Sequence, residues 1–218
     1  MELLENNFVI NLDVRPDRYQ HVLEEFKKID IEPRRFNAIK TRDGAVGCTM
    51  SHIKCIEIAI EEDKEHIFIC EDDITFTDAY TLKRNIKRFN DNVKNWDVLI
   101  IGGNVVKPYE KIEDYCLKII NCQTTTGYVV KKHYYKKLLD NFKTGANKLL
   151  TTGSKREYAI DIFWKTLQKI DNWYLLYPLT VTQYENYSDI EGKKTNYDHL
   201  MLDPNKEWLY KRLNFIPK

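Results

Sequence analysis

The sequence predicts a single α/β domain in which helices flank a central sheet. Short apolar runs rich in β-branched and aromatic residues alternate with segments whose apolar residues recur at helical spacing. Several of these runs end in charged residues or glycine, at the position where strands of an open α/β sheet meet a ligand. The 218 residues can bury a sizeable core unaided, and no internal repeat or low-complexity linker divides them.

The strand predicted over residues 66–70 is the centre of the candidate site, because it runs directly into Glu71, Asp72 and Asp73. Three carboxylates this close repel one another unless a cation or hydrogen-bond donors compensate their charge. A divalent cation that also holds a diphosphate would do so, since such ions combine one or two carboxylates with phosphate oxygens and water. The alternative is a solvated acidic turn after the strand.

Two arginines are predicted near the same edge of the sheet. A strand over residues 8–12 leads into a tight loop and then a helix with Pro16 in its first turn. This order places Arg15 and Arg18 close to the carboxyl end of the first strand, where their planar guanidinium groups could clamp phosphates. The alternative is that they pair with acidic residues of the same helix.

The next segments add further candidate binding residues. A short strand over 34–39 and a loop over 41–47 precede a helix that begins near Cys48. Ser51 and His52 lie in the first turns of that helix, and His52 could donate to a ligand; a core or capping histidine is the alternative.

A buried strand is predicted from Trp96 and ends in Gly102 and Gly103. Paired glycines let the backbone approach a neighbour or a ligand closely, and a tight turn is the alternative.

The second half of the chain is predicted as a loop over 104–117, strands over 118–122 and 124–130, a polar connection over 143–156, a helix over 157–170 and a strand over 173–178. Asp161 lies among apolar residues of that helix. A buried unpaired carboxylate is costly, so Asp161 is capped, paired or functional. Its alternative role is an ion pair with Lys165 one helical turn away.

Composition limits the classes of function. The net charge of +1 gives no global field that would attract nucleic acid or a membrane surface. No apolar run reaches about 18 residues, and the N-terminus lacks the features of a signal peptide. The five cysteines are interpreted as reduced thiols, and no Cys/His spacing typical of zinc is present. We therefore expect a cytoplasmic protein without a transmembrane segment.

The motifs occur in a familiar order over roughly residues 7–190. They are Val9-Ile10-Asn11-Leu12 with Arg15 and Arg18, Arg35 to Ile39, Gly47 to His52, Phe68 to Asp73, Trp96-Asp97, Gly102-Gly103, Thr126-Gly127-Tyr128, Asp161 with Phe163, and Gln183 with Ser188-Asp189-Ile190. This ordered set resembles glycosyltransferase family 25, which includes lipopolysaccharide and procollagen galactosyltransferases.

The resemblance implies a GT-A fold, a Rossmann-like mixed sheet flanked by helices that binds a nucleotide-sugar. It implies a single GT-A domain over residues 1–190, and residues 191–218 match no motif and are expected to form a tail that packs on or extends from it. It also implies Mn²⁺ or Mg²⁺ at an Asp-x-Asp-type motif, here Glu71-Asp72-Asp73, with Asp73 as the direct ligand and Glu71 as a second or water-mediated one. The donor-binding residues are expected to be Asn11, Arg15, Arg18, Ser51, His52, Glu71, Asp72, Gly102, Gly103 and Gln183.

The same resemblance implies transfer of a hexose from UDP-galactose or UDP-glucose, with inversion at the anomeric carbon. The acceptor would be a hydroxyl of a glycan, a lipid-linked glycan or a protein. A single displacement needs a carboxylate base, and Asp161 is the first candidate and Asp189 the second.

Two other functions are compatible with parts of the sequence. A module that binds a nucleotide-sugar without turnover would keep the same fold. A phosphatase of the haloacid dehalogenase type would use an acidic strand end, but Glu71 stands where its aspartate nucleophile is required.

Overall fold

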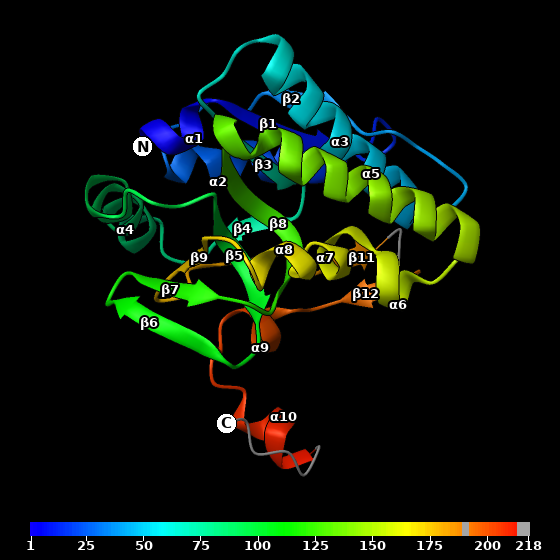
Figure 1. Ribbon diagram of the computed structural model, residues 1–218. Helices are drawn as coiled ribbons and strands as arrows, with labels where there is room; N and C mark the ends of the chain where they lie inside the picture. Colours follow the sequence, from blue (N-terminus) through cyan, green and yellow to red (C-terminus); the bar gives the residue numbers. More distant parts are fainter. Residues whose placement is uncertain (189–191, 213–218) are drawn as a thin grey trace.

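The computed structural model describes residues 1–188 and 192–212 and contains an eight-stranded mixed sheet between two layers of helices (Figure 1). The strand order is β2-β1-β3-β8-β5-β9-β7-β6. These strands are β1 Asn7–Asn11, β2 Arg35–Asn37, β3 His66–Glu71, β5 Val98–Val105, β6 Tyr109–Glu113, β7 Cys116–Ile119, β8 Cys122–Lys131 and β9 Trp173–Leu176. The predicted α/β fold class, a mixed central sheet flanked by helices, is confirmed.

Shorter elements surround this sheet. The helices are α1 Glu2–Glu5, α2 Pro16–Lys28, α3 Gly44–Glu61, α4 Ala79–Asn92, the 3-10 turn η1 Lys132–Tyr134, α5 Tyr135–Thr152, α6 Lys155–Tyr158, α7 Ile160–Phe163, α8 Lys165–Gln168, α9 Asp198–Met201 and α10 Glu207–Arg212. Two small antiparallel pairs join β4 Ile74–Phe76 with β10 Val181–Gln183, and β11 Asn186–Ser188 with β12 Lys193–Thr195.

Strand direction explains where the site forms. β1 runs parallel to β2 and β3, whereas β8 lies antiparallel between β3 and β5. The carboxyl ends of β1, β3 and β5 therefore meet the first residues of β8 at one edge of the sheet. In the pairing of β3 with β8, Cys70 lies opposite Gly127, so Glu71 lies beside the threonines that open β8.

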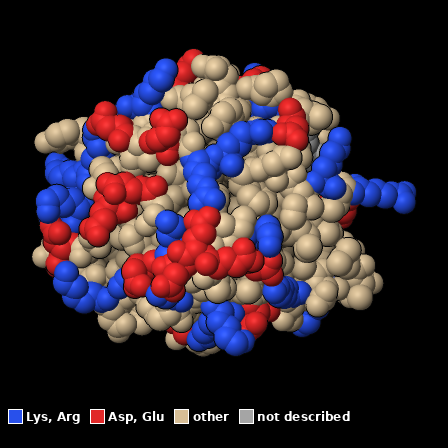
Figure 2. Space-filling view, turned by 90° about the horizontal axis from the view of Figure 1, so that it is seen from above, with Lys and Arg blue, Asp and Glu red and all other residues tan. Residues whose placement is uncertain are grey.

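Two apolar clusters hold the layers together, one on each face of the sheet. Successive residues of β3 alternate between them: Ile67 and Ile69 pack with α3 and α5, and Phe68 and Cys70 pack with α2 and α4. This alternation is expected of a strand that is buried on both faces. The rim of the α3–α5 layer carries ion pairs such as Lys143–Glu57 at 2.8 Å. On the face in Figure 2, acidic and basic side chains are correspondingly interspersed.

Four local predictions were wrong. The strand expected over 118–122 is instead the end of β7, two residues outside any strand and the first residue of β8. Residues 104–117 are not a loop, because β5 continues through Gly102 and Gly103 to Val105 and β6 and β7 then form a hairpin. Residues 143–156 are mostly helical: α5 extends to Thr152 and stops at Gly153, whose φ of +69° is in the left-handed region. The helix expected over 157–170 is three short helices.

The described part of the tail packs on the same sheet. Met201 is fully buried, and the Nζ of buried Lys206 donates to the backbone oxygens of Val105 and Asp203. The hydroxyl of Thr182 donates to Asp198 at 2.7 Å and links β10 to α9. All five cysteines are free thiols. Among the described residues, no helix has the length and apolarity needed to cross a membrane.

Gly102 is required by the close approach of β10, because a Cβ there would lie 2.5 Å from the Cγ1 of Val181. We expect Gly102→Ala to lower the free energy of unfolding by about 1–3 kcal/mol, since it overpacks the core. The double variant Gly102→Ala/Val181→Ala should recover part of that loss. Denaturant unfolding of both single variants and the double variant measures the coupling, and simple additivity of the two losses would contradict this assignment.

Candidate functional site

The site is built around a guanidinium group that bridges two carboxylates. Arg18, from the first turn of α2, places its Nε 3.0 Å from Asp72 Oδ1 and its Nη2 2.6 Å from Asp73 Oδ2. All three side chains are largely buried. Burial disfavours the charged guanidinium, but the two carboxylates outweigh this effect and raise the pKa of Arg18. The arginine therefore compensates much of the charge repulsion that the sequence indicated at this turn.

Asp73 keeps one oxygen uncompensated. Its Oδ1 is buried and makes no hydrogen bond. Burial, opposed by Arg18, raises the pKa of Asp73 to about 7 from its ordinary 3.8. A buried carboxylate oxygen without a partner is costly, and a hard divalent cation prefers such an oxygen. The residues present therefore fit Mn²⁺ or Mg²⁺ at Asp73.

Asp72 is held from a second direction. Asn11, at the end of β1 and almost fully buried, donates from Nδ2 to Asp72 Oδ2 at 2.7 Å and to the backbone oxygen of Arg15. Burial raises the pKa of Asp72, while Arg18 and Asn11 act against it. Asn11 and Asp72 thus fix the loop that carries the arginines, which is a positioning role in this conformation.

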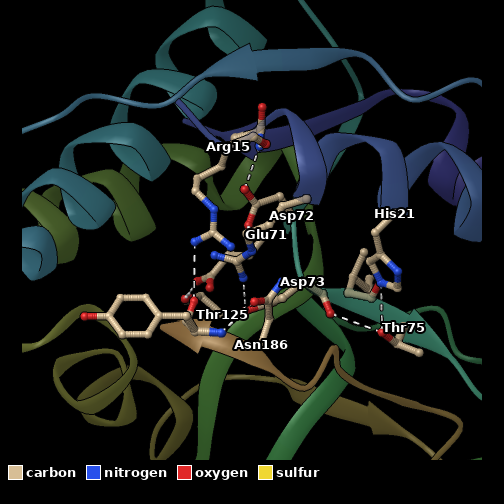
Figure 3. Close-up of polar contacts among 12 residues, drawn as sticks. Arg15, His21, Glu71, Asp72, Asp73, Thr75, Thr125 and Asn186 are labelled. Atoms are coloured by element: carbon tan, nitrogen blue, oxygen red, sulfur yellow. Dashed lines mark hydrogen bonds and ion pairs between the residues drawn. The ribbon is translucent and has the colours of Figure 1, made fainter. Parts of the chain in front are cut away.

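Glu71 points to a different set of partners, because successive residues of a strand face opposite sides. Thr125 lies beside Glu71 (Figure 3), and its hydroxyl donates to Glu71 Oε1. The Nε2 of His52 lies 3.6 Å from the same oxygen. Burial alone would raise the pKa of Glu71, but His52, Thr125 and Arg18 together lower it. Glu71 therefore makes its direct contacts with Thr125 and His52, whereas Arg18 contacts Asp72 and Asp73.

Arg15 links the motif to the chain's later segments. Its guanidinium donates to both oxygens of Asp17 and to the backbone oxygen of Tyr187 in β11 at 3.3 Å. The turn at Asp73 is held similarly, because its backbone oxygen accepts from the amide of Tyr184 at 2.6 Å. Figure 3 shows Arg15, Asp73 and Asn186 of β11 around the same space. The β11 segment therefore borders the site.

Asp161 lies at the start of α7 and is half-buried. Its Oδ2 accepts the backbone amide of Thr124, a non-glycine residue with φ +70°, at 3.1 Å. Burial is the main cause that raises the pKa of Asp161, and Glu71 adds to it. Among the described residues, no ion pair joins Asp161 to Lys165. Asp189, the second candidate base, lies outside the described residues.

Four other predicted binding residues are buried in this conformation. Ser51 and His52 are both 0 % exposed; Ser51 accepts from the amide of Ile39 and donates to the oxygen of Gly47. Gly102 and Gly103 are likewise buried in β5. In this conformation all four lie beneath the side chains that are exposed at the site. Gln183 is half-buried at the end of β10, where it pairs with Ile74 beside the motif.

Sequence reasoning missed three contributors. Thr125 bonds Glu71, the amide of Thr124 bonds Asp161, and the hydroxyl of Tyr128 lies 3.0 Å from Nδ1 of His52. All three come from β8. The available signal was the run of three consecutive threonines at 124–126 near the start of β8, a strand that is otherwise largely buried.

Carboxylates and arginines gathered at the carboxyl edge of an open α/β sheet are typical of proteins that bind phosphorylated nucleotides. The chain belongs to glycosyltransferase family 25: the model of that family, described as a lipopolysaccharide biosynthesis protein, matches residues 42–164. This match includes the acidic motif, α3, β8 and Asp161.

Two related proteins with glycosyltransferase names match this chain over part of their length. A Haemophilus influenzae protein named as a candidate glycosyltransferase is 33% identical over 92 residues, which is 32% of this chain and 33% of that protein. A glycosyltransferase 25 family member of Aedes aegypti is 23% identical over 173 residues, which is 61% of this chain and 27% of that protein. The chain thus spans a third or less of the length of these two relatives.

Solved structures resemble the fold. The crystal structure of A197 from STIV has a TM-score of 0.50 at 14% identity, and the match covers 87% of this chain and 93% of that one. At this identity the likeness supports the shared fold alone.

The raised pKa of Asp73 predicts a pH-dependent stability. Between its ordinary value of 3.8 and about 7, the folded protein binds more protons at this carboxyl than the unfolded chain does. Its contribution to the free energy of unfolding therefore falls as pH rises through this window and is constant above it. Without divalent ions, Asp73→Asn should gain stability relative to the wild type from pH 5 to pH 7. A difference that is flat with pH would contradict the assignment.

Proposed function

We propose that this chain is a glycosyltransferase that moves a hexose, galactose or glucose, from a UDP-sugar to a hydroxyl of a glycan, a lipid-linked glycan or a protein. The observation that carries the proposal is the Asp72–Arg18–Asp73 bridge with its unpartnered buried oxygen, at the sheet edge of a family 25 member. The family match favours this function over the phosphatase alternative, which also lacks its aspartate nucleophile.

The proposed reaction is one displacement. The acceptor oxygen bonds to the anomeric carbon while the bond from that carbon to the diphosphate oxygen breaks, which inverts the configuration. The departing diphosphate gains negative charge, and in this proposal the guanidinium groups of Arg15 and Arg18 stabilise it. Arg18 can make this contact by exchanging part of its bridge to Asp72 and Asp73 for phosphate oxygens.

A bound Mn²⁺ or Mg²⁺ would supply further positive charge for the diphosphate. Asp73 would hold it through the oxygen that now lacks a hydrogen bond. Glu71 points toward Thr125 and His52, so we assign it to the sugar side of the donor or to a water-mediated contact with the cation.

Asp161 is the proposed base that takes the proton of the acceptor hydroxyl, and Asp189 stays the second candidate. Burial already raises the pKa of Asp161, which makes its carboxylate a better proton acceptor than an exposed aspartate. The amide of Thr124 binds one oxygen and leaves the other for the acceptor.

Donor binding can be tested by thermal unfolding with a panel of nucleotide-sugars, each with and without Mn²⁺. A donor at about 100 times its Kd stabilises the native state by about 2.7 kcal/mol. We expect UDP-galactose or UDP-glucose to raise the Tm of the wild type only with Mn²⁺, and Asp73→Ala to lose this metal-dependent gain. Full transfer activity in EDTA would contradict the role of the cation, and binding without transfer or donor hydrolysis would favour the non-catalytic module.

Asp161→Asn tests the base separately. It should lower kcat by about 10²- to 10⁴-fold, since a positioned base contributes this much, and leave the donor affinity unchanged. Lys165→Met is the matched control from the next helix and should retain turnover. Unchanged turnover in Asp161→Asn would rule out this base.

A further inference from the structure

Next to the acidic motif Glu71-Asp72-Asp73, the structure brings together a sulfur, a nitrogen and an oxygen atom that could bind a metal ion. Cys48 and His52 lie one turn apart on α3 and therefore share a face of the helix. Glu71 reaches them from the end of β3. One ligand atom from each residue lies within 4.8 Å of the others. The sequence showed no typical zinc spacing, because only two of the three residues are close along the chain.

The distances within this cluster are too long for good hydrogen bonds. His52 Nε2 is 3.6 Å and Cys48 Sγ 3.9 Å from Glu71 Oε1. Around a tetrahedral zinc ion, with bonds of about 2.0–2.3 Å, such ligand atoms lie about 3.3–3.7 Å apart. The two distances to Glu71 Oε1 are therefore within a few tenths of an ångström of coordinating separations, and all three atoms lie within 4.8 Å of one another.

His52 shows the clearest sign of a missing partner. The side chain is 0 % exposed, and its Nε2 makes no hydrogen bond. Its Nδ1 lies 3.0 Å from the hydroxyl of fully buried Tyr128. When Nδ1 donates to that hydroxyl, the Nε2 lone pair points into the cluster, which is the arrangement by which an outer partner orients a metal-binding histidine.

Charge favours a dication at this position. Burial, followed by Glu71 and Asp161, raises the pKa of the Cys48 thiol, and the same carboxylates attract a cation. Coordination would release the thiol proton to solvent. A thiolate, a carboxylate and a neutral imidazole around one dication have no net charge, which limits the cost of burial. Cys48 and Glu71 are partly exposed, so an ion can enter from the donor side.

We propose that Cys48, His52 and Glu71 form a binding site for a thiophilic divalent cation, best matched by zinc, distinct from the oxygen site at Asp73. A thiolate and an imidazole select zinc over Mn²⁺ or Mg²⁺, which prefer oxygen ligands. Water or a substrate atom would complete the coordination. A zinc ion bound here would withdraw Glu71 from the sugar donor and so inhibit sugar transfer. This consequence rests on the proposed function, whereas the binding of zinc does not.

Cobalt(II) alone is the probe, since a cobalt–thiolate bond gives a near-ultraviolet charge-transfer band. We expect the reduced, metal-free protein to bind one equivalent with this band and zinc to displace it. Cys48→Ser should abolish the band and weaken binding about 100-fold or more. Cys55→Ala, a matched control on the same helix, and Asp73→Asn should keep it.

Three results would overturn the proposal: no band at saturating cobalt, an unchanged band in Cys48→Ser, or a band lost in Asp73→Asn. Circular dichroism checks that each variant is folded, and Glu71→Gln, which should weaken cobalt binding about tenfold or more, replaces Cys48→Ser if that variant does not fold. A separate assay compares zinc inhibition of Mn²⁺-supported sugar transfer in the wild type and Cys48→Ser. Absence of transferase activity would contradict the proposed function, and the cobalt result would still decide whether the metal site exists.

Discussion

The site depends on one electrostatic constraint: two largely buried carboxyl groups directly after β3 need nearby positive charge whenever both are ionised. Arg18 supplies it here by contacting both Asp72 and Asp73. A buried pair of this kind contributes little net stability, yet removing one partner costs about 3–5 kcal/mol. The loop after β1 is therefore tied to the acidic turn, and Asn11 reinforces the tie through Asp72.

The same constraint explains why the carboxylates of one short motif behave differently. Arg18 compensates Asp73 incompletely, so burial keeps the pKa of Asp73 high. Glu71 faces His52 and Thr125 instead, and its pKa is low. Neighbouring residues of a strand thus enter two environments, one suited to an oxygen-seeking cation and one bounded by sulfur and nitrogen. The unusual β8, which runs against β3, makes the second environment possible.

Much of the fold followed from local patterns. The apolar runs of β1, β3, β5 and β9 and the spacing in α2 and α4 were sufficient to predict an α/β sheet, and the acidic turn indicated its functional edge. The errors arose where tertiary contacts override local polarity. β6 is largely exposed and stabilised by pairing with β7, and α5 continues past Lys143 because Ala146 and Leu149 pack inward.

The site was predictable only in part, for a geometric reason. Residues adjacent in sequence, such as Glu71 and Asp73, could be grouped, and Arg15 and Arg18 could be placed near them. The partners from β8 could not be predicted. That strand lies antiparallel between β3 and β5, and its direction decides which of its ends meets the motif. Ser51 and His52 were predicted at the donor, and the structure buries both; the sequence could not show how deep this turn of α3 lies.

The hydrogen bond between Thr182 and Asp198 has a consequence for variation among related chains. This bond joins the two ends of the segment that includes β11 and β12. Beyond it, buried Lys206 ties the chain to the backbone oxygen of Val105. The entropy cost of a closed loop grows only slowly with its length. Changes of length or composition between these anchors would therefore cost the fold little, and they would alter the wall that Tyr187 and Asn186 present to the site. If the chain transfers a sugar as proposed, changes in this segment are expected to alter its preference for the acceptor.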